Sequence, residues 1–171
     1  MGPVSAEIEI DASREQVFAA LTDLAGRPSF TDHFLEGFHL TRIDSRGVGA
    51  GARFQVQGPL RKVWMDTAIV SLDPPFQIVE EGSGGRGNRI RNHTVWELRE
   101  TSGSLTCVRV SHWTEPAPVD RALELLSAGS IWAGRGWNKA LRRLRDNLEA
   151  DRAVAERIAV AGGNRYATGI P

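Results

Sequence analysis

The spacing of apolar and polar residues changes period twice along the chain. Residues 4–10 alternate between apolar and polar side chains, which is typical of a half-buried β-strand. A helical spacing follows, and Ser13 and Gln16 have the separation of a capping box at a helix N-terminus. Arg27-Pro28 prevents a simple continuation of this helix. A short second helix is predicted at about residues 29–35.

The middle of the chain, residues 38–115, has no helical period and consists of short alternating runs between turn-forming residues. These runs predict about six antiparallel strands joined by hairpins. The glycine-rich segment 82–87 matches the glycine pattern of dinucleotide-binding motifs. Such a motif needs a helix N-terminus after it, and here a strand follows, so a hairpin loop is predicted. In the clearest run, residues 89–99, the face predicted to be buried contains Ile90, Asn92, Thr94, Trp96 and Leu98. In the next strand one face contains Val108, Val110 and His112.

The last third of the chain returns to the helical period and keeps it to about residue 150. It predicts an amphipathic helix of about 30 residues, whose inward stripe contains Val119, Leu123, Leu126, Ser130, Ala133, Gly134, Trp137, Leu141, Leu144 and Leu148. Small residues occupy the middle of this stripe, at Ser130, Ala133 and Gly134. Because protein interiors are close-packed, small residues there predict a cavity between the helix and the sheet. Close backbone packing against large neighbouring side chains is the alternative.

The order of these elements indicates an α+β domain. We expect a curved antiparallel sheet of about seven strands wrapped around the long C-terminal helix, with two short helices after the first strand. Residues 1–150 would form this ligand-binding domain, and residues 151–171 the end of the helix and a flexible tail.

The predicted cavity lining combines polar and apolar side chains. Its polar groups must each pair within the protein, hold water or meet a ligand, and they are Thr67, Asn92, Thr94, His112 and Ser130. Apolar contact would come from Phe34, Phe54, Met65, Trp96, Val110, Trp137 and Leu141, with Gly134 leaving room on the helix. The register between residues 38 and 70 decides which side chains of that stretch point inward, because a slip of one residue turns them outward.

The composition narrows the function classes. The 171 residues include 21 basic and 21 acidic side chains, so no excess charge indicates a nucleic-acid partner. The single cysteine, Cys107, excludes an intramolecular disulfide and a multi-cysteine metal site.

No apolar run reaches the roughly 20 residues of a membrane span, and the first residues lack the pattern of a signal peptide. We therefore expect a cytoplasmic protein. Neither a cofactor nor a metal is expected, because metal-ligand spacing is missing among the histidines His33, His39, His93 and His112.

Several segments resemble the START-like (SRPBCC) superfamily, which includes polyketide cyclases/dehydrases and lipid-transport domains. The resemblance rests on the entry segment at residues 8–23, the Asp73-Pro74-Pro75 turn, the strand at residues 94–98 and the long last helix, and it covers about residues 4–150. It implies a helix-grip fold, in which a curved sheet wraps the C-terminal helix around a hydrophobic ligand cavity. The superfamily has no universal catalytic motif, so the resemblance implies no active-site residues.

Three functions remain open at this point. The first is binding of a small hydrophobic or aromatic molecule, lipid- or polyketide-like, in the internal cavity. The second is a cofactor-independent cyclase/dehydratase that uses His112 as a general acid/base, because an unperturbed imidazole titrates near neutrality. Its second acid or base would be Asp66 or Glu80. The third is a protein-interaction module, for which Leu125 and Trp132 on the outer side of the last helix would also provide a homodimer contact.

Overall fold

The computed structural model describes residues 2–57, 62–102, 105–115 and 129–163, and the side chains of the last helix as far as Asp151. Its elements, in chain order, are β1 (Val4–Asp11), α1 (Arg14–Thr22), α2 (Pro28–Thr31), β2 (Leu35–Leu40), β3 (Gly51–Gln57), β4 (Lys62–Asp73), β5 (Gln77–Gly84), β6 (Ile90–Ser102), β7 (Leu105–Glu115) and α4 (Gly129–Gly163). None of the helices in this described part of the chain combines the length and apolar character needed to cross a membrane.

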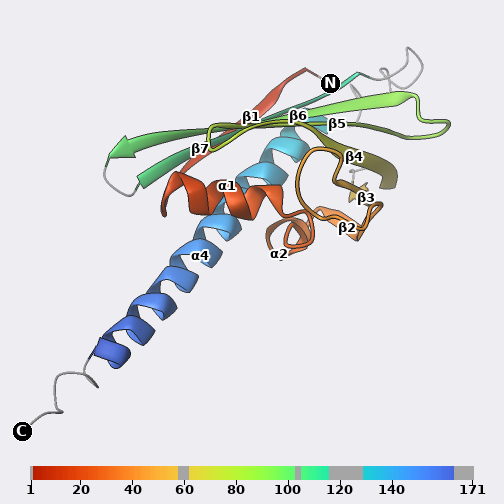
Figure 1. Cartoon of the computed structure of the whole chain (residues 1–171). Coiled ribbons are helices and arrows are strands. Elements are labelled where there is room, and N and C mark those ends of the chain that lie inside the picture. The colour runs from red at the N-terminus through yellow and green to blue at the C-terminus, as the bar shows by residue number, and fades with distance from the viewer. Residues whose placement is uncertain (1, 58–61, 103–104, 116–128, 164–171) are drawn as a thin grey trace, which may run out of the picture.

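The strands form one antiparallel sheet of seven strands in the order β1-β7-β6-β5-β4-β3-β2. The helices lie on one side of this curved sheet, and α4 crosses it and projects beyond α1 (Figure 1). The predicted α+β class and helix-grip arrangement are thereby confirmed. The strand order also explains the curvature, because each hairpin joins neighbouring strands and their accumulated twist bends the sheet toward α4.

The capping box predicted before α1 is present. The Ser13 hydroxyl accepts a hydrogen bond from the Gln16 backbone N–H at 3.3 Å, and the Gln16 side chain accepts one from the Ser13 backbone N–H at 3.0 Å. These two bonds satisfy N–H groups that have no partner within the helix itself. They fix the point at which the chain leaves β1 and turns back under the sheet.

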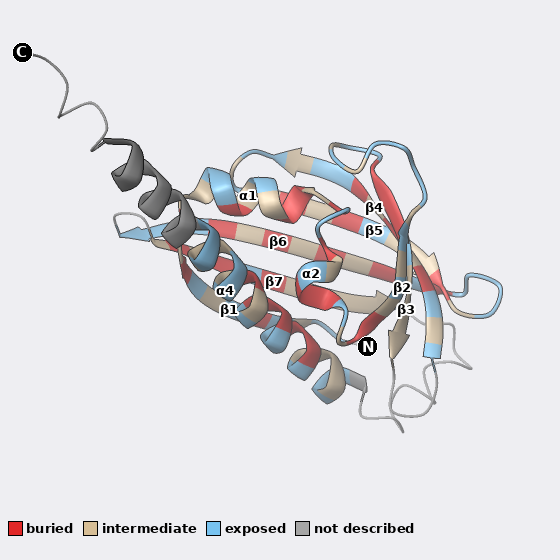
Figure 2. Ribbon diagram, turned by 90° about the horizontal axis from the view of Figure 1, so that it is seen from below, coloured by how far each residue is buried: buried red, intermediate tan, exposed pale blue. Residues whose placement is uncertain are grey.

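The inward residues of neighbouring strands line up in rows, and the first two rows are apolar. Register pairs Leu98 with Val108 and Ile8 in one row, and the next row consists of Ile78, Trp96, Val110 and Ala6. All of these except Ile8 are buried (Figure 2). Val17 and Leu21 from α1 belong to the same core cluster. We call these two rows the apolar half of the inner face, and they confirm the alternation predicted for β6 and β7.

The packing of α4 differs in part from the predicted stripe. Trp137, Leu141 and Leu144 are buried as predicted, but Ser130 is exposed and does not line the inner face. The reason is the position of Gly134, where a Cβ atom would lie 3.3 Å from Val4, the first residue of β1. Ser130 lies one helical turn before Gly134 and therefore extends past the end of β1. The predicted gap between helix and sheet at Ser130 is therefore wrong.

A different glycine of α4 makes the close approach. A Cβ atom at Gly136 would lie 2.9 Å from the Phe34 ring, and His33 Nε2 donates to the Gly136 carbonyl at 3.1 Å. Trp132 is half-buried and packs edge-on against Phe34, with ring centroids 6.5 Å apart. A homodimer contact through Trp132 stays a prediction. His33 and Phe34, which follow α2, thus contact the face of α4 that was predicted to be exposed to solvent.

Other boundaries differ in detail. The second helix, α2, is shorter than predicted and ends at Thr31. The glycine-rich segment forms the end of β5 and a hairpin turn before β6, as expected, with positive φ angles at Gly85, Gly87 and Asn88. The predicted inward leucines and Val119 at the start of the last helix, and also Leu125, lie outside the described residues. The helix itself continues without interruption past residue 150 to Gly163.

Replacement of Ser13 by Ala tests the capping box. The variant loses the acceptor for the Gln16 N–H, so we expect the free energy of unfolding to fall by about 1 kcal/mol in urea denaturation. Ser71→Ala is the matched control, because this exposed serine lies within strand β4 and caps no helix. An equal effect of the two substitutions would contradict the role of the cap.

Candidate functional site

The next two rows of the inner face are polar where the first two are apolar. Register aligns Glu80, Thr94 and His112 on β5, β6 and β7, with Ile69 and Val4 at the ends of this row. The following row contains Gly82, Asn92 and Thr114 on the same three strands. We call these two rows, together with Thr67 on β4, the polar half of the inner face. Three adjacent strands therefore bring its side chains together by register alone.

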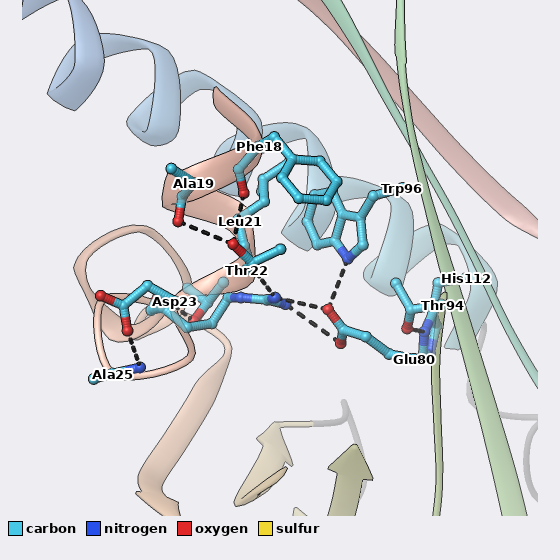
Figure 3. A network of polar contacts seen from close by, with 12 residues as sticks. Phe18, Ala19, Leu21, Thr22, Asp23, Ala25, Glu80, Thr94, Trp96 and His112 are labelled. Atoms are coloured by element: carbon cyan, nitrogen blue, oxygen red, sulfur yellow. Dashed lines mark hydrogen bonds and ion pairs between the residues drawn. The ribbon is translucent and has the colours of Figure 1, made fainter. Parts of the chain in front are cut away.

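His112 and Thr94 form the centre of the polar half. Thr94 Oγ1 and His112 Nδ1 lie 2.9 Å apart across the β6–β7 pair (Figure 3). Within the described part of the chain, no residue provides a hydrogen-bond partner for His112 Nε2. The ring is half-buried and lies 5.7 Å from the Trp137 ring on α4, centroid to centroid. The sheet thus holds one nitrogen of His112, and the described residues leave the other without a hydrogen-bond partner.

The protonation state of His112 follows from its surroundings. Burial lowers the pKa of this imidazole from 6.5 to about 4, with a smaller electrostatic contribution from nearby His93. The ring is therefore neutral at physiological pH, with one nitrogen as donor and the other as acceptor. A neutral ring recognises a polar group without introducing a charge.

A buried ion pair lies where the polar half meets the apolar half. Arg27 Nη2 donates to Glu80 Oε1 at 2.7 Å, and both side chains are almost fully buried. The same guanidinium donates to the Leu21 carbonyl at 2.8 Å, and Trp96 Nε1 donates to Glu80 Oε1 at 2.9 Å (Figure 3). Arg27 also lies over the Trp96 ring, 5.1 Å from its centroid. The pair fastens the loop after α1 to the centre of the sheet.

In the second polar row, the Asn92 amide is held by a hydrogen bond to β4, and Gly82 has no room for a side chain. Asn92 is buried, and its Nδ2 donates to the Asp66 carbonyl of β4 at 3.0 Å. Gly82 lies so close to β4 that a Cβ atom there would be 1.8 Å from the Asp66 carbonyl oxygen. Any larger residue would separate β4 from β5. Thr67 is the neighbouring inward side chain on β4 and is buried.

Aromatic rings surround the helix side of this region. Phe34 and Trp137 meet edge to face at 5.1 Å, and Trp137 meets Trp96 in the same way at 5.4 Å. Phe38 stacks on Phe54 at 5.6 Å, with the two rings nearly parallel. These contacts connect α4 to Phe34 and to β6, and they connect β2 to β3.

The predicted site residues separate into three groups. The polar half contains Thr67, Asn92, Thr94 and His112, as expected. Six further predicted residues are buried in the core cluster or beside it, and these are Phe34, Met65, Trp96, Val110, Trp137 and Leu141. Phe54 is half-buried and Gly134 lies against Val4, whereas Ser130 is exposed.

The candidate second acids are not available to the site. The Asp66 carboxylate lies on the outer face, 3.7 Å from Arg53 Nε, and the Glu80 carboxylate is held by Arg27 and Trp96. Arg27 was not predicted to take part. Its only sequence signal is its place before Pro28, which says nothing about a partner 53 positions away.

Comparison with known proteins agrees with this geometry. Residues 1–150 match the family model described as polyketide cyclase/dehydrase and lipid transport. No curated protein matches the chain.

Solved structures resemble the fold at low sequence identity. TTHA0849 from Thermus thermophilus has 19% identity and a TM-score of 0.67, and the match covers 87% of this chain and 98% of that chain. A START superfamily protein from Mycobacterium smegmatis has 18% identity and a TM-score of 0.61, covering 86% and 97%. DynU16, from the dynemicin biosynthetic locus, has 19% identity and a TM-score of 0.56, covering 87% of this chain and 48% of that chain. At these identities the likeness shows the fold alone.

The Arg27–Glu80 pair gives a stability prediction. Arg27→Met leaves a buried carboxylate without its partner, and we expect a loss of about 3–5 kcal/mol in the free energy of unfolding. Adding Glu80→Gln should recover part of this loss, because the uncompensated charge is removed. Arg109→Met is the control, since Arg109 and Glu7 form an exposed pair at 2.8 Å and should contribute at most about 1 kcal/mol. Equal losses at both pairs would show that burial does not strengthen the Arg27–Glu80 contact.

The lowered pKa of His112 predicts a pH dependence of stability. Between pH 6.5 and about 4 the unfolded chain binds a proton at this histidine and the folded chain does not. The free energy of unfolding therefore decreases as the pH is lowered through this window. The decrease is up to about 3 kcal/mol if the whole pKa shift develops on folding. His112→Gln should remove this contribution. Urea denaturation of both proteins across the window measures the difference, and parallel profiles would contradict the assignment.

Proposed function

Because the chain belongs to the polyketide cyclase/dehydrase and lipid transport family, we propose that it binds a small hydrophobic molecule, lipid- or polyketide-like. The binding place is the space between the polar half of the inner face and α4. His112, Thr94 and Asn92 orient the molecule, and the rings of Phe34 and Trp137 provide apolar contact.

The change in character along the inner face is the observation that supports this proposal. The apolar half is filled by large side chains such as Trp96 and Leu98, which are fully buried against α1 and its neighbours. At equivalent inward positions the polar half has Gly82, Thr94 and Thr67, which are small. A sheet that only needed a solid core would continue the apolar pattern, because buried polar groups cost free energy unless they find partners.

The same observations favour binding over catalysis. A general base works best when its pKa lies near the operating pH, and burial lowers the pKa of His112 to about 4. Glu80 is committed to Arg27, and Asp66 lies on the opposite face of the sheet. His112 is therefore suited to hydrogen bonding rather than to proton transfer.

The interaction-module alternative has little support. Trp132 packs against Phe34, so this ring is partly used in holding α4 to the segment after α2. Leu125, the second residue of the expected surface contact, lies outside the described residues. The proposal therefore places the partner inside the fold rather than on the surface of α4.

A pair of substitutions on β4 tests for the binding space. Thr67→Leu enlarges an inward side chain of the polar half, and Ala68→Leu makes a similar change on the outer face of the same strand. We expect Thr67→Leu to weaken binding of Nile red, a neutral hydrophobic probe, at least tenfold in a fluorescence titration, while Ala68→Leu leaves it nearly unchanged. The free energy of unfolding of Thr67→Leu should change by less than about 1 kcal/mol, because the new atoms enter open space.

Two results would contradict the proposal. One is a failure of the unmodified protein to bind Nile red. The other is a loss of about 1–3 kcal/mol in the stability of Thr67→Leu with unchanged probe binding, which is typical of overpacking in a filled core.

A further inference from the structure

His112 Nε2 has no hydrogen-bond partner among the described residues, and the contact at Nδ1 determines whether Nε2 donates or accepts. We infer that His112 presents Nε2–H as a donor, that Thr94 fixes this tautomer, and that the bound molecule is an uncharged compound whose acceptor oxygen, such as a ketone or quinone carbonyl, meets this donor. The inference rests on the proposed binding function and adds the chemical class of the ligand. It also gives Thr94 a role as a positioning residue.

The tautomer follows from the hydrogen-bond requirements of Thr94. Its hydroxyl lies 2.9 Å from His112 Nδ1, and either group could donate in this contact. If Nδ1–H donated, the hydroxyl hydrogen of the buried Thr94 would need another acceptor, and the described residues provide none. An unsatisfied buried donor costs about 1–3 kcal/mol. The hydroxyl therefore donates to Nδ1, and the ring proton of the neutral imidazole lies on Nε2.

A second donor without a partner lies nearby. Arg27 Nε is buried and has no hydrogen-bond partner within the described residues, although the other nitrogens of the guanidinium bind Glu80 and the Leu21 carbonyl. Glu80, the carboxylate that this guanidinium binds, is paired in register with Thr94. A ligand that meets His112 Nε2–H must offer an acceptor.

The charges of the site favour a neutral ligand. The positive charge of Arg27 is matched by Glu80 at 2.7 Å, and His112 is neutral at physiological pH. An anionic ligand would place its charge next to the Glu80 carboxylate without an additional cation among the described inward residues. Burying an uncompensated charge is costly. A carbonyl oxygen meets the His112 donor without this cost.

The tautomer can be measured without any ligand. Nuclear magnetic resonance of isotope-labelled histidine nitrogens distinguishes a protonated from an unprotonated ring nitrogen. At neutral pH we expect His112 to show protonated Nε2 and unprotonated Nδ1. Thr94→Ser keeps the hydroxyl and should keep this pattern, whereas Thr94→Val should shift both signals toward an average of the two tautomers. A protonated Nδ1 in the unmodified protein, or an unchanged pattern in Thr94→Val, would overturn the role of Thr94.

The ligand class is tested with three probes that share one aromatic frame. Fluorenone carries a carbonyl, fluorene carries no oxygen, and fluorene carboxylate carries a charge. In calorimetric titration we expect fluorenone to bind about fivefold to tenfold more tightly than fluorene, as one added hydrogen bond implies. Fluorene carboxylate should bind more weakly than either. His112→Phe should remove the advantage of fluorenone, and His112→Gln, which keeps an N–H donor, should retain part of it.

The outcomes separate this inference from the proposed function. Equal affinity for fluorenone and fluorene, or tightest binding of the carboxylate, would overturn the ligand class while leaving hydrophobic binding intact. Failure of Nile red and of all three probes to bind would contradict the proposed function and the ligand class together. The nuclear magnetic resonance measurement would still decide the role of Thr94 in that case.

Discussion

The buried contact between Arg27 and Glu80 determines how the rest of the molecule is divided. Removing two charges from water costs several kcal/mol per ion, and direct attraction repays this only when further hydrogen bonds satisfy the remaining atoms. Here Trp96 and the Leu21 carbonyl provide such bonds. The contact therefore holds the loop after α1 at the middle of the sheet. On one side of it the inner face is packed with apolar side chains, and on the other side lie the polar groups of β5, β6 and β7.

Register across β5, β6 and β7 assembles the polar groups. Glu80, Thr94 and His112 come from three strands, yet each lies directly opposite the next because the hairpins fix the pairing. A slip of one residue in β6 would turn Thr94 and Asn92 to the outer face and separate all of these contacts. The geometry of the site is thus as rigid as the centre of the sheet, which suits recognition of a ligand by a few directed hydrogen bonds.

Local signals in the sequence were sufficient for most of the fold. The capping box at Ser13 and the alternation in β6 are properties of adjacent residues, and the structure confirms both. The pairing of Arg27 with Glu80 could not be predicted, because it joins a loop to a strand and leaves no periodic pattern. Ser130 was misplaced for a related reason: helical periodicity gives the direction of a side chain, but it does not show where the neighbouring strand ends. Gly136 was missed because its partner, Phe34, follows a helix that contacts the side of α4 away from the sheet.

The absence of a side chain at Gly82 limits how this scaffold can adapt during evolution. Even a methyl group there would collide with the β4 backbone, so this position cannot be used to reshape the interior. Of the neighbouring inward positions, Asn92 is constrained by its bond to the β4 backbone, whereas no side-chain hydrogen bond from a described residue constrains Thr67. Thr67 is consequently the least constrained route by which descendants of this protein could acquire a new specificity.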